Sequence, residues 1–565
     1  MNKILTILLC YISCQTIHAG QVTEAQALQK AQRFMSGKQL ITSPQTRGGG
    51  QTDSQPFYVF NAKDNAGYVI VSGDDRTEEI LAFSEQGSLD VENAPENLKW
   101  WLGYYERVIK SLGTKSYARR VESRAAKEDI PYLIKTTWSQ TAPYNNDCPE
   151  IGTGKCLTGC LATAMAQVMN YWQYPASIEE IPAYDPIYDR LFGPSMKALP
   201  QTEFNWTALQ KDDKADAEFK TEVAKLCLYC GQSVRMGYAT DNLGGSRALD
   251  GIGIVGLVKH FKYDKGTRYI FRGAFSDSAW EDSIYNELKN GRPVIYSGQS
   301  EAANGAAPYG HTFICDGYKE VDNVGYFHIN WGWGTDPTNA YYLLSLPQVS
   351  GYTFSEDQSA VIGIQPPKND VAKHKMLSLT KLDLLQSPVV TRASVDEIFP
   401  PIYFSWVIKN TVVERTTATL DFILTNEDKM VSHLGSTIFD ILPGWNISNA
   451  ESQMSSGAMK ADGVYRLYPR FTMAGDPPGL VPVEGSDYRY IEIIVEGLKM
   501  TIKAYPEDIL KGDANGDGVV NMKDRDLILA AIAAGKYDKQ YDVNTDGKIT
   551  VADIVALYDI IDNNQ

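Results

Sequence analysis

The chain has 565 residues, which is too long for one ordinary domain and favours two to four. Its hydrophobic content of 43% provides enough apolar side chains for folded cores and argues against bulk disorder. The formal net charge of −16 argues against nonspecific binding to nucleic acid or to an anionic membrane, so neither is an expected partner.

Residues 1–19 have the pattern of a secretory signal peptide. The apolar run Ile4–Ile12 follows a basic residue, and a small-residue cleavage site precedes Gly20. A buried N-terminal helix is one alternative. A lipoprotein cut before Cys14 is another, although Tyr11 occupies a position where a small aliphatic residue is usual. No later run reaches the roughly 18 apolar residues that a membrane helix needs, so we expect a secreted, periplasmic or cell-surface protein.

Residues 20–129 are predicted to form a small α+β unit that ends in a linker. A helix is expected in 20–45, strands at FYVFNA, GYVIVSGDD and LAFSEQG, and an amphipathic helix at 97–112. The following segment, TKSYARRVESRAAKEDI, is polar and basic without an apolar period. Such a segment is expected to be exposed and easily cut by proteases.

Residues 130–366 are predicted to form one α+β domain, because helical patterns come first and strand patterns follow. The helices are expected at 160–174, 215–231, 246–262 and 278–290. The strands are expected at RPVIYSG, GHTFICDGY, GYFHINWGW and AYYLLSL.

A cysteine opens the first of these helices, in the stretch TGCLATAMAQVMNYW. Apolar residues follow Cys160 at spacings of about three and four, so one helix face should be buried. The first turn of a helix stabilises an anion, and a helix N-terminus lowers the pKa of a thiol. Gly159 allows another chain to approach closely. The pattern predicts a nucleophilic thiol at Cys160, and an inert, half-buried cysteine is the alternative.

A nucleophilic cysteine needs a base. His311 starts a strand after a glycine-rich loop, at an interval after Cys160 close to that of papain-like enzymes, and is the expected base. His328 lies inside a predicted strand and is expected to be packed or hydrogen-bonded. His260 ends a helix, a position that suits an imidazolium without catalysis.

The strand FHINWGWG is expected to pair with the strand of His311. Asn330 would then hold the imidazole by an amide hydrogen bond, and Trp331 would shield that contact from water. Trp333 is predicted to form a wall of the substrate cleft, and Gly310 is assigned to substrate binding beside it.

The stretches TGCLATAMAQVMNYWQYP and GHTFICDGY…GYFHINWGWG resemble the streptopain family of secreted bacterial cysteine peptidases, a branch of the papain-like fold. The resemblance covers about residues 130–366. It implies that Cys160 is the nucleophile, His311 the base and Trp331 an orienting residue. Papain carries an oxyanion-hole glutamine where this chain has Gly154, so the second donor must lie elsewhere, and Gln299 is one candidate.

The N-terminal unit is similar to the propeptide of the same family through FYVFN, GYVIVSGDD and ILAFSEQG. This resemblance implies a zymogen in which the propeptide inhibits its own catalytic domain until the basic linker is cut. A permanent structural domain is the alternative.

Other cysteines leave two questions open. Cys148 and Cys156 flank a glycine-containing loop, so these two thiols could pair in an oxidising compartment. Cys227 and Cys230 form a CxxC pattern on an apolar helix face. Buried core thiols are favoured there over a metal or redox site, because no second CxxC or histidine pair accompanies them.

Residues 370–505 change to short strands separated by turns, which predicts an all-β, immunoglobulin-like sandwich with a spacer or binding role. No titratable cluster is evident in this region.

Residues 511–565 contain two copies of a calcium-type loop, DANGDGVVNMKD and DVNTDGKITVAD, each followed by an apolar helix. Aspartate stands at position 12 and one helix follows each loop, so the repeat resembles a dockerin and not an EF-hand. A dockerin implies a cohesin-like partner, and a calcium-stiffened cap on the sandwich is the alternative. The predicted ligands are Asp513, Asn515, Asp517, the Val519 carbonyl and Asp524 in the first loop, and Asp542, Asn544, Asp546, the Lys548 carbonyl and Asp553 in the second.

These features together predict a secreted cysteine endopeptidase made as a zymogen. It would act on protein or peptide substrates without a catalytic cofactor and would bind structural calcium. A catalytically inactive papain-like domain kept for adhesion and a thiol-dependent acyl transferase are the competing interpretations.

Overall fold

The structure is a computed structural model, and its description covers most of the chain. The described residues are 20–42, 55–112, 126–189, 191–248, 252–272, 275, 277–299, 310–334, 337–346, 358–368, 377–410, 416–426, 429–441, 446–473, 481–482, 490–505, 514, 522–534, 541, 543 and 549–562.

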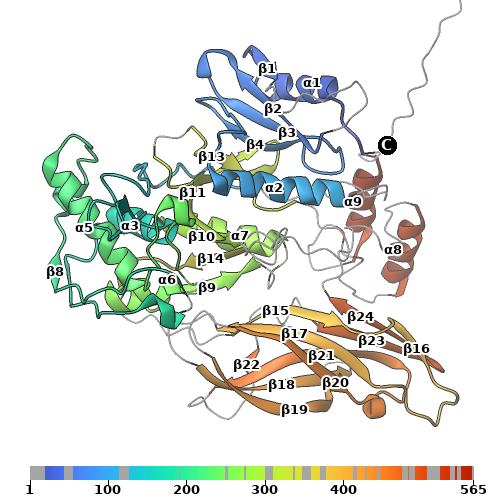
Figure 1. Ribbon diagram of the computed structural model, residues 1–565. Coiled ribbons are helices and arrows are strands. Elements are labelled where there is room, and N and C mark those ends of the chain that lie inside the picture. Colours follow the sequence, from blue (N-terminus) through green and yellow to red (C-terminus); the bar gives the residue numbers. More distant parts are fainter. Residues whose placement is uncertain are drawn as a thin grey trace, which may run out of the picture.

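The N-terminal unit, residues 20–112, packs two helices on a four-stranded antiparallel sheet (Figure 1). A capping box between Thr23 and Gln26 starts the first helix, since each side chain accepts from the other's backbone N–H. In chain order its elements are α1 (Glu24–Phe34), β1 (Leu40–Thr42), β2 (Phe57–Ala62), β3 (Tyr68–Ser72), β4 (Ile80–Ser84) and α2 (Glu96–Ser111).

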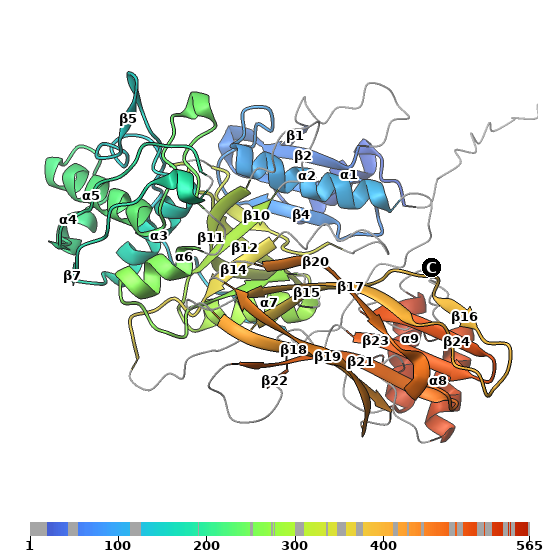
Figure 2. The ribbon, with the colours of Figure 1, turned by 60° about the horizontal axis from the view of Figure 1, so that its bottom comes forward.

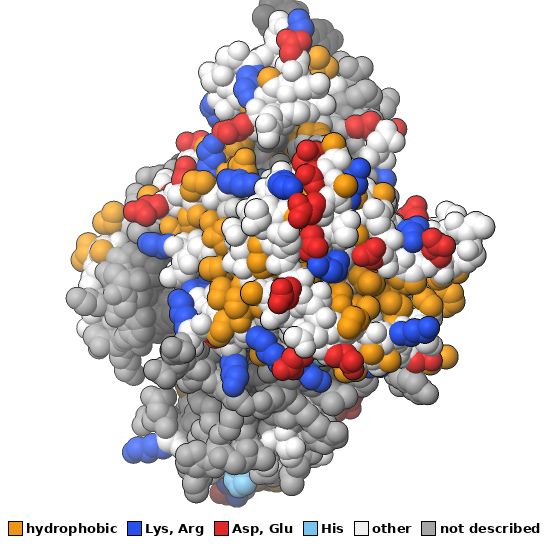
Figure 3. All heavy atoms as spheres, turned by 90° about the vertical axis from the view of Figure 1, so that its left-hand side faces the viewer, with side chains coloured by type: hydrophobic (Ala, Val, Ile, Leu, Met, Phe, Trp, Pro, Cys, Tyr) orange, Lys and Arg blue, Asp and Glu red, His pale blue; other side chains and the backbone are white. Residues whose placement is uncertain are grey.

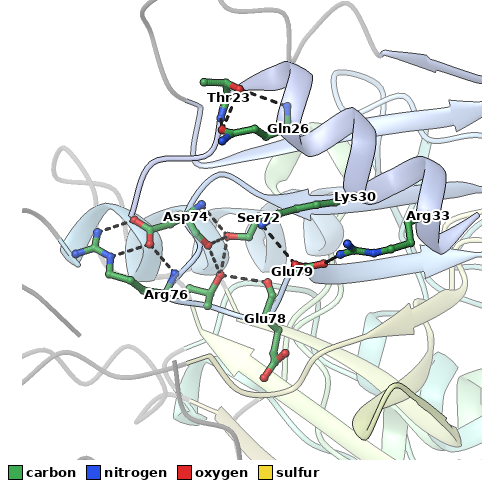
Figure 4. A network of polar contacts seen from close by, with 10 residues as sticks. Thr23, Gln26, Lys30, Arg33, Ser72, Asp74, Arg76, Glu78 and Glu79 are labelled. Atoms are coloured by element: carbon green, nitrogen blue, oxygen red, sulfur yellow. Dashed lines mark hydrogen bonds and ion pairs between the residues drawn. The ribbon is translucent and has the colours of Figure 1, made fainter. Parts of the chain in front are cut away.

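A buried ion pair fixes the turn after β3 (Figure 4). Arg76 donates from Nε to Asp74 Oδ1 at 2.7 Å and from Nη2 to Asp74 Oδ2 at 2.5 Å. Its Nη1 also reaches the carbonyl of Leu112, at the C-terminal end of α2. The same residue thereby joins the β3–β4 turn to the end of α2.

The central unit, residues 126–368, places helices and short turns beside a six-stranded sheet. Its main helices are α3 (Cys160–Trp172), α5 (Ala217–Ser233) and α7 (Asp277–Lys289). Its sheet strands are β9 (Arg268–Phe271), β10 (Val294–Gln299), β11 (Gly310–Val321), β12 (Val324–Asn330), β13 (Ala340–Tyr342) and β14 (Gln358–Ile362). Shorter elements complete it: β5 (Glu150–Ile151), β6 (Gly154–Lys155), β7 (Ser177–Ile178), β8 (Thr202–Glu203) and α4 (Trp206–Leu209).

One predicted helix is shorter than its sequence pattern suggested. In place of a helix over 246–262, the described residues form α6 (Ile252–Val255), followed by a wider helical turn at Gly256–His260. A Cβ at Gly256 would lie 2.7 Å from Ser233 Oγ, so the close approach to α5 requires glycine, a poor helix former.

The two units share a single antiparallel sheet, in the order β1-β2-β3-β4-β13-β12-β11-β10-β14-β9. The junction is the pairing of β4 with β13, where Phe83 faces Tyr341 and Ala82 faces Tyr342. One hydrophobic core runs from α1 through α2 to β10, β11 and β12. The sequence predicted that the N-terminal unit packs on the central unit, and the structure adds that it extends the same sheet.

The helices α2 and α3 lie on opposite faces of β10 and β11 (Figures 1 and 2). Tyr296 and Phe313 belong to the core that contains α2. Ile295 and Ile314 belong to the separate core that contains α3. This alternation follows the two-residue period of a strand, and it decides where the site residues point.

Residues 377–505 form a two-sheet β-sandwich, with a three-stranded sheet facing a seven-stranded one. Both sheets contribute to one core, in which the rings of Phe404 and Phe422 lie 4.9 Å apart. The sandwich contacts the central unit where the Lys409 ammonium lies 4.3 Å from the centre of the Phe271 ring. Its strands are β15 (Leu377–Leu384), β16 (Val389–Thr391), β17 (Ile402–Asn410), β18 (Thr416–Asn426), β19 (Lys429–Ile441), β20 (Asn446–Met454), β21 (Gly463–Met473), β22 (Val481–Pro482), β23 (Tyr490–Glu496) and β24 (Lys499–Tyr505).

The C-terminal module contains α8 (Met522–Ala534) and α9 (Val551–Asp562), each beginning at the tenth residue of one of the predicted calcium loops. A small core joins the two repeats through Ile528 and Leu557, both fully buried.

Within the described residues, none of the helices combines the length and the apolar character required to cross a membrane. Figure 3 shows the face on the left of Figure 1, where acidic and basic side chains are interspersed with hydrophobic patches.

Candidate active site

Cys160 is the first residue of α3, as the sequence predicted. Gly159 precedes it with φ of 86°, and a Cβ there would lie 2.6 Å from Met236 Cε, so this turn requires glycine. The sulfur receives hydrogen bonds from the backbone N–H and hydroxyl of Thr312 and from the Leu161 amide in the first turn of α3. The thiol therefore stands at a helix N-terminus and contacts β11 directly.

The charge state of this thiol differs from the sequence expectation. Burial raises the pKa of Cys160 above its ordinary value of 9.0, although the hydrogen bonds from Thr312 and the helix amides act in the opposite direction. Desolvation outweighs the helix terminus here, so the neutral thiol is favoured in this structure.

We therefore expect Cys160 of the intact chain to react slowly with iodoacetamide at neutral pH. A raised pKa keeps the thiolate fraction low until the pH rises above 9.0, since the thiolate is the reactive form. Alkylation rates measured by mass spectrometry between pH 6 and 10 check this. A fast reaction at pH 6 in the uncut chain would contradict it.

His311 is the second residue of β11, opposite Gly298 on β10. Its neighbour Thr312 pairs with Ser297, and their hydroxyls lie 3.0 Å apart on the face that contacts Cys160. Because side chains alternate along a strand, His311 points to the other face, the one covered by α2. A Cβ on Gly298 would lie 2.0 Å from the ring of Trp100 in α2, which places that indole beside the buried His311.

Cys160 and His311 thus occupy adjacent elements but opposite faces of β11. The structure brings Thr312 to the sulfur instead of His311. If the His311 side chain turned to the other face at the start of β11, it would meet Cys160 as a nucleophile–base pair.

The predicted orienting residues also divide between these faces. Asn330, at the end of β12, donates from Nδ2 to the Thr136 carbonyl at 2.9 Å and to Gln167 Oε1 at 3.4 Å. Its expected hydrogen bond to His311 is therefore replaced by contacts with α3 and the 136–138 segment. Asn330 is paired with Ile314, which lies two residues after Thr312 and therefore on the same face of β11. Asn330 faces α3 for this reason.

Trp331 lies in the core under α2. Its indole N–H donates to the Thr338 carbonyl at 3.0 Å, and its ring centre lies 4.6 Å from that of Phe313 and 6.1 Å from that of Trp101. It therefore occupies the same face as His311. Trp333 is partly buried at the edge of this core.

Three further residues named in the sequence analysis lie at the ends of strands. Gly310 is exposed at the start of β11. Gln299 ends β10, but its side chain lies outside the described residues. Gly154 forms the short β6 with Lys155, and a Cβ there would lie 2.8 Å from Thr240 Cγ2.

The two competing histidines have other roles. His328 is buried, and its Nδ1 lies 2.6 Å from Asp316 Oδ1, which agrees with the expected hydrogen-bonded position. His260 was expected to suit an imidazolium at a helix end. Instead, burial, followed by Lys259 and Lys262, lowers its pKa to about 4.

We expect His260 to make the chain less stable in acid. Its pKa falls from 6.5 to about 4 on folding, so between these values only the unfolded chain binds the proton. The contribution to stability is complete above pH 6.5 and is lost as the pH falls toward 4. The measurement is the urea concentration at the unfolding midpoint, plotted against pH. His260→Gln should flatten this curve between pH 6.5 and 4, and an unchanged curve would contradict the assignment.

Among the described residues, the other five cysteines are free and buried: Cys148, Cys156, Cys227, Cys230 and Cys315. Cys148 and Cys156 stay unpaired thiols in this structure, and burial, with Cys156 as a lesser cause, raises the pKa of Cys148 to about 12. Cys230 donates to Met169 Sδ at 3.6 Å inside the core of α3 and α5. These contacts agree with core thiols at the CxxC pattern.

Two of the ten predicted calcium ligands lie in the described residues. Asp524 and Asp553, the twelfth residues of the loops, are both fully buried. Asp553 Oδ2 accepts from the Thr550 N–H at 2.7 Å. The other eight predicted ligands lie outside the described residues.

Sequence reasoning missed Thr312 and the Trp100–Gly298 contact. The first was accessible, because strand alternation alone puts His311 and Thr312 on opposite faces. The second has no local signal, since α2 and β10 are far apart along the chain.

Family models match both units that share the sheet. The Peptidase C10 family matches residues 138–342, and the Spi protease inhibitor matches residues 19–109. The second match covers the N-terminal unit, whose α2 lies beside His311.

Known relatives span the same region. Streptopain of Streptococcus pyogenes serotype M1 is 31% identical over 352 residues, covering 56% of this chain and 83% of streptopain. The thiol protease/hemagglutinin PrtT of Porphyromonas gingivalis is 30% identical over 410 residues, covering 65% of this chain. The chain spans only 44% of the length of PrtT.

A solved structure of Prevotella intermedia prointerpain A is 30% identical and covers 58% of this chain and 99% of that chain, with a TM-score of 0.48. The active interpain A cysteine protease is 32% identical, with a TM-score of 0.37. With streptopain matched over more than two thirds of its length, the chain belongs to the Peptidase C10 family of cysteine proteases.

Proposed function

We propose that the protein is a secreted cysteine endopeptidase in its latent, proenzyme form. The observation that carries this proposal is the hydrogen bonding of Thr312 to Cys160. This contact brings β11, the strand of the candidate base, to the candidate nucleophile. The residue that meets the sulfur is Thr312, the one after His311. The helix that occupies the face of His311 comes from the inhibitor-like unit.

Activation then requires a local change at the start of β11. His311 is preceded only by Gly310 within the strand, so few ladder contacts oppose rotation of its backbone. Departure of α2 removes Trp100 from the space beside Gly298. The imidazole can then exchange places with the Thr312 hydroxyl and meet the sulfur.

The chemistry that follows uses this pair. His311 takes the proton of Cys160, and the thiolate attacks the peptide carbonyl carbon. The backbone N–H of Cys160 donates to the oxyanion at the helix N-terminus. The proton on His311 passes to the leaving amine, and water then hydrolyses the thioester with His311 as base.

The N-terminal unit acts as the inhibitory propeptide. It holds the central unit by the β4–β13 pairing and by hydroxyl contacts, such as Tyr105 donating to the Leu343 carbonyl at 2.8 Å. The basic linker between α2 and Lys127 is the proposed cleavage region. From the sequence, we also propose that residues 1–19 are a signal peptide that directs export and that a cut in the linker matures the protein.

Purified precursor incubated beside a Cys160→Ala precursor tests this function. Self-cleavage between α2 and Lys127 in the intact form alone, followed by labelling of Cys160 with an epoxide thiol inhibitor, is the expected result. A wild-type chain that does not cleave itself, and whose Cys160 stays unlabelled after trypsin has cut the linker and the N-terminal unit has been removed, would favour an inactive binding domain. Products joined to an added amine would favour acyl transfer.

We also propose that the C-terminal module binds two structural calcium ions. Asp524 and Asp553 are buried carboxylates at equivalent positions of the two repeats, which suits the last ligand of each loop. The remaining oxygens would come from the loop residues identified in the sequence. A cohesin-like protein is the proposed partner of this dockerin-like module, and the sandwich is proposed to be an immunoglobulin-like spacer.

Calcium should therefore stabilise the module. At a free concentration about 100 times the dissociation constant, binding one ion adds about 2.7 kcal/mol to the stability of the folded state. Calorimetry with calcium and with EDTA should show a module transition that moves, while the transition of the larger units stays. Asp524→Asn together with Asp553→Asn should remove the shift, and a shift that survives would contradict the assignment.

A further inference from the structure

A buried Asp–His pair lies on the strand that carries His311. Asp316 is fully buried, and β11 has an irregular register there, since Cys315 faces Ile329 while Gly317 faces His328. Asp316 is thus the extra residue of a β-bulge, with no opposite residue on β12. Its carboxylate accepts from His328 Nδ1 at 2.6 Å, which requires the proton on that nitrogen.

The second oxygen of Asp316 binds another part of the chain. Oδ2 accepts from the Ile134 N–H at 2.9 Å, and the Asp316 carbonyl accepts from the Leu133 N–H at 2.9 Å. Two further bonds join Ile130 to Tyr318, each 2.8 Å long. The 127–134 segment, which directly follows the proposed cleavage region, therefore lies along β11 and is tied to the bulge.

Aromatic rings cover the His328 side of this pair. The Tyr132 ring stacks on His328 at 4.7 Å between centres, and the Tyr341 ring meets it edge-on at 5.3 Å. Gly317 allows this packing, because a Cβ there would lie 2.9 Å from Tyr132 Cα. The pair is therefore held by the 127–134 segment and by Tyr341 of β13.

Packing alone does not require such a pair. Buried ionic groups carry a desolvation penalty, and apolar residues of similar size often replace them without loss of stability. The Asp316–His328 contact joins the bulged residue of β11 to β12 and so helps to hold the register of these two strands. A slip by one residue moves His311 about 3.3 Å along the strand.

We propose that Asp316 and His328 are positioning residues, which hold the bulge and the 127–134 segment so that His311 reaches Cys160 in the mature enzyme. This inference rests on the proposed protease function. It assigns a role to the first residues of the mature chain, which remain bound to β11 after the linker is cut.

Three variants of the precursor, matured by trypsin cleavage of the linker, test the assignment. His328→Leu keeps an apolar side chain but cannot donate to Asp316. His328→Asn places an amide donor near the position of Nδ1. Asp316→Asn keeps the volume of Asp316 but loses one of its two acceptors. The measurements are kcat and KM on a peptide, and the rate of Cys160 alkylation by iodoacetamide from pH 4 to 10.

His328→Leu and Asp316→Asn are expected to lower kcat about 100-fold, the cost of a misplacement of about 1 Å, with KM within about twofold of wild type. Both should also lose the alkylation at low pH that a thiolate–imidazolium pair supports. His328→Asn should restore most of both. If His328→Leu does not fold, Asp316→Asn and His328→Asn give the same comparison.

A lower melting temperature with unchanged kcat and an unchanged alkylation profile would overturn the positioning role and leave the protease function intact. A wild-type enzyme that lacks both hydrolysis and low-pH reactivity would overturn the proposed function, and this inference with it.

Discussion

Replacement of Cys160 by alanine is expected to abolish peptide hydrolysis by the matured chain, with a loss on the order of 10⁶-fold in kcat. His311→Ala should lose a similar amount, because a thiol without its base is a poor nucleophile and the two groups act as one unit. The double variant should be no slower than either single variant. Steady-state kinetics on a peptide substrate measure all three after linker cleavage by trypsin.

These substitutions separate chemistry from folding. Cys160 is half-buried in the first turn of α3, where alanine is a good helix former, so the unfolding temperature should stay close to wild type. Cys227→Ala is the matched control, since that thiol is buried in the core of α3 and α5 and has no proposed part in catalysis. This control variant is expected to be less stable than wild type but to keep the wild-type kcat. Hydrolysis that survives Cys160→Ala would contradict the assigned nucleophile.

The sequence predicts the elements of the site better than their mutual orientation. The spacing of apolar residues after Cys160 predicts α3 because its periodicity is local, and the helix begins and ends close to the expected residues. The strands of His311 and Asn330 follow from their patterns and pair as a hairpin as expected. Strand alternation already separates His311 from Thr312, but no local pattern encodes which of the two faces α2 covers.

The pKa shifts of Cys160 and His260 also differ from the sequence expectation, because they too depend on tertiary packing. The helix N-terminus at Cys160 and the helix end at His260 are visible in the sequence, and each favours the charged form. Burial acts against the charged form in both cases, and it depends on elements from other parts of the chain. The direction of the two pKa shifts could therefore be predicted only with the tertiary packing known.

Removal of the Trp101 side chain should release the enzyme from its propeptide. Trp101 is fully buried, and its ring meets those of Phe313 at 5.8 Å, Tyr296 at 6.0 Å and Trp331 at 6.1 Å, all in the central unit. Truncating such a tryptophan costs about 3–5 kcal/mol. At about 1.4 kcal/mol for each factor of ten, the inhibition constant of a separately added N-terminal unit should rise about 10²- to 10³-fold.

The measurement is inhibition of the trypsin-matured enzyme by purified N-terminal unit, as wild type, Trp101→Ala or Lys110→Ala. Lys110 lies on the exposed face of the same helix and forms a surface pair with Glu106, so its removal should change the constant less than about twofold. Circular dichroism of each unit shows whether it is folded before mixing. Equal inhibition by a folded Trp101→Ala unit would contradict the role of α2.

The result bears on how latency ends. The N-terminal unit shares a sheet and a core with the central unit, so a cut in the linker breaks none of the contacts that hold α2 beside His311. A cut wild-type chain should therefore regain activity only as the unit dissociates or is degraded, whereas a cut Trp101→Ala chain should be active at once on dilution. A common rate of activation for both chains would mean that the linker itself, and not the aromatic face of α2, keeps His311 away from Cys160.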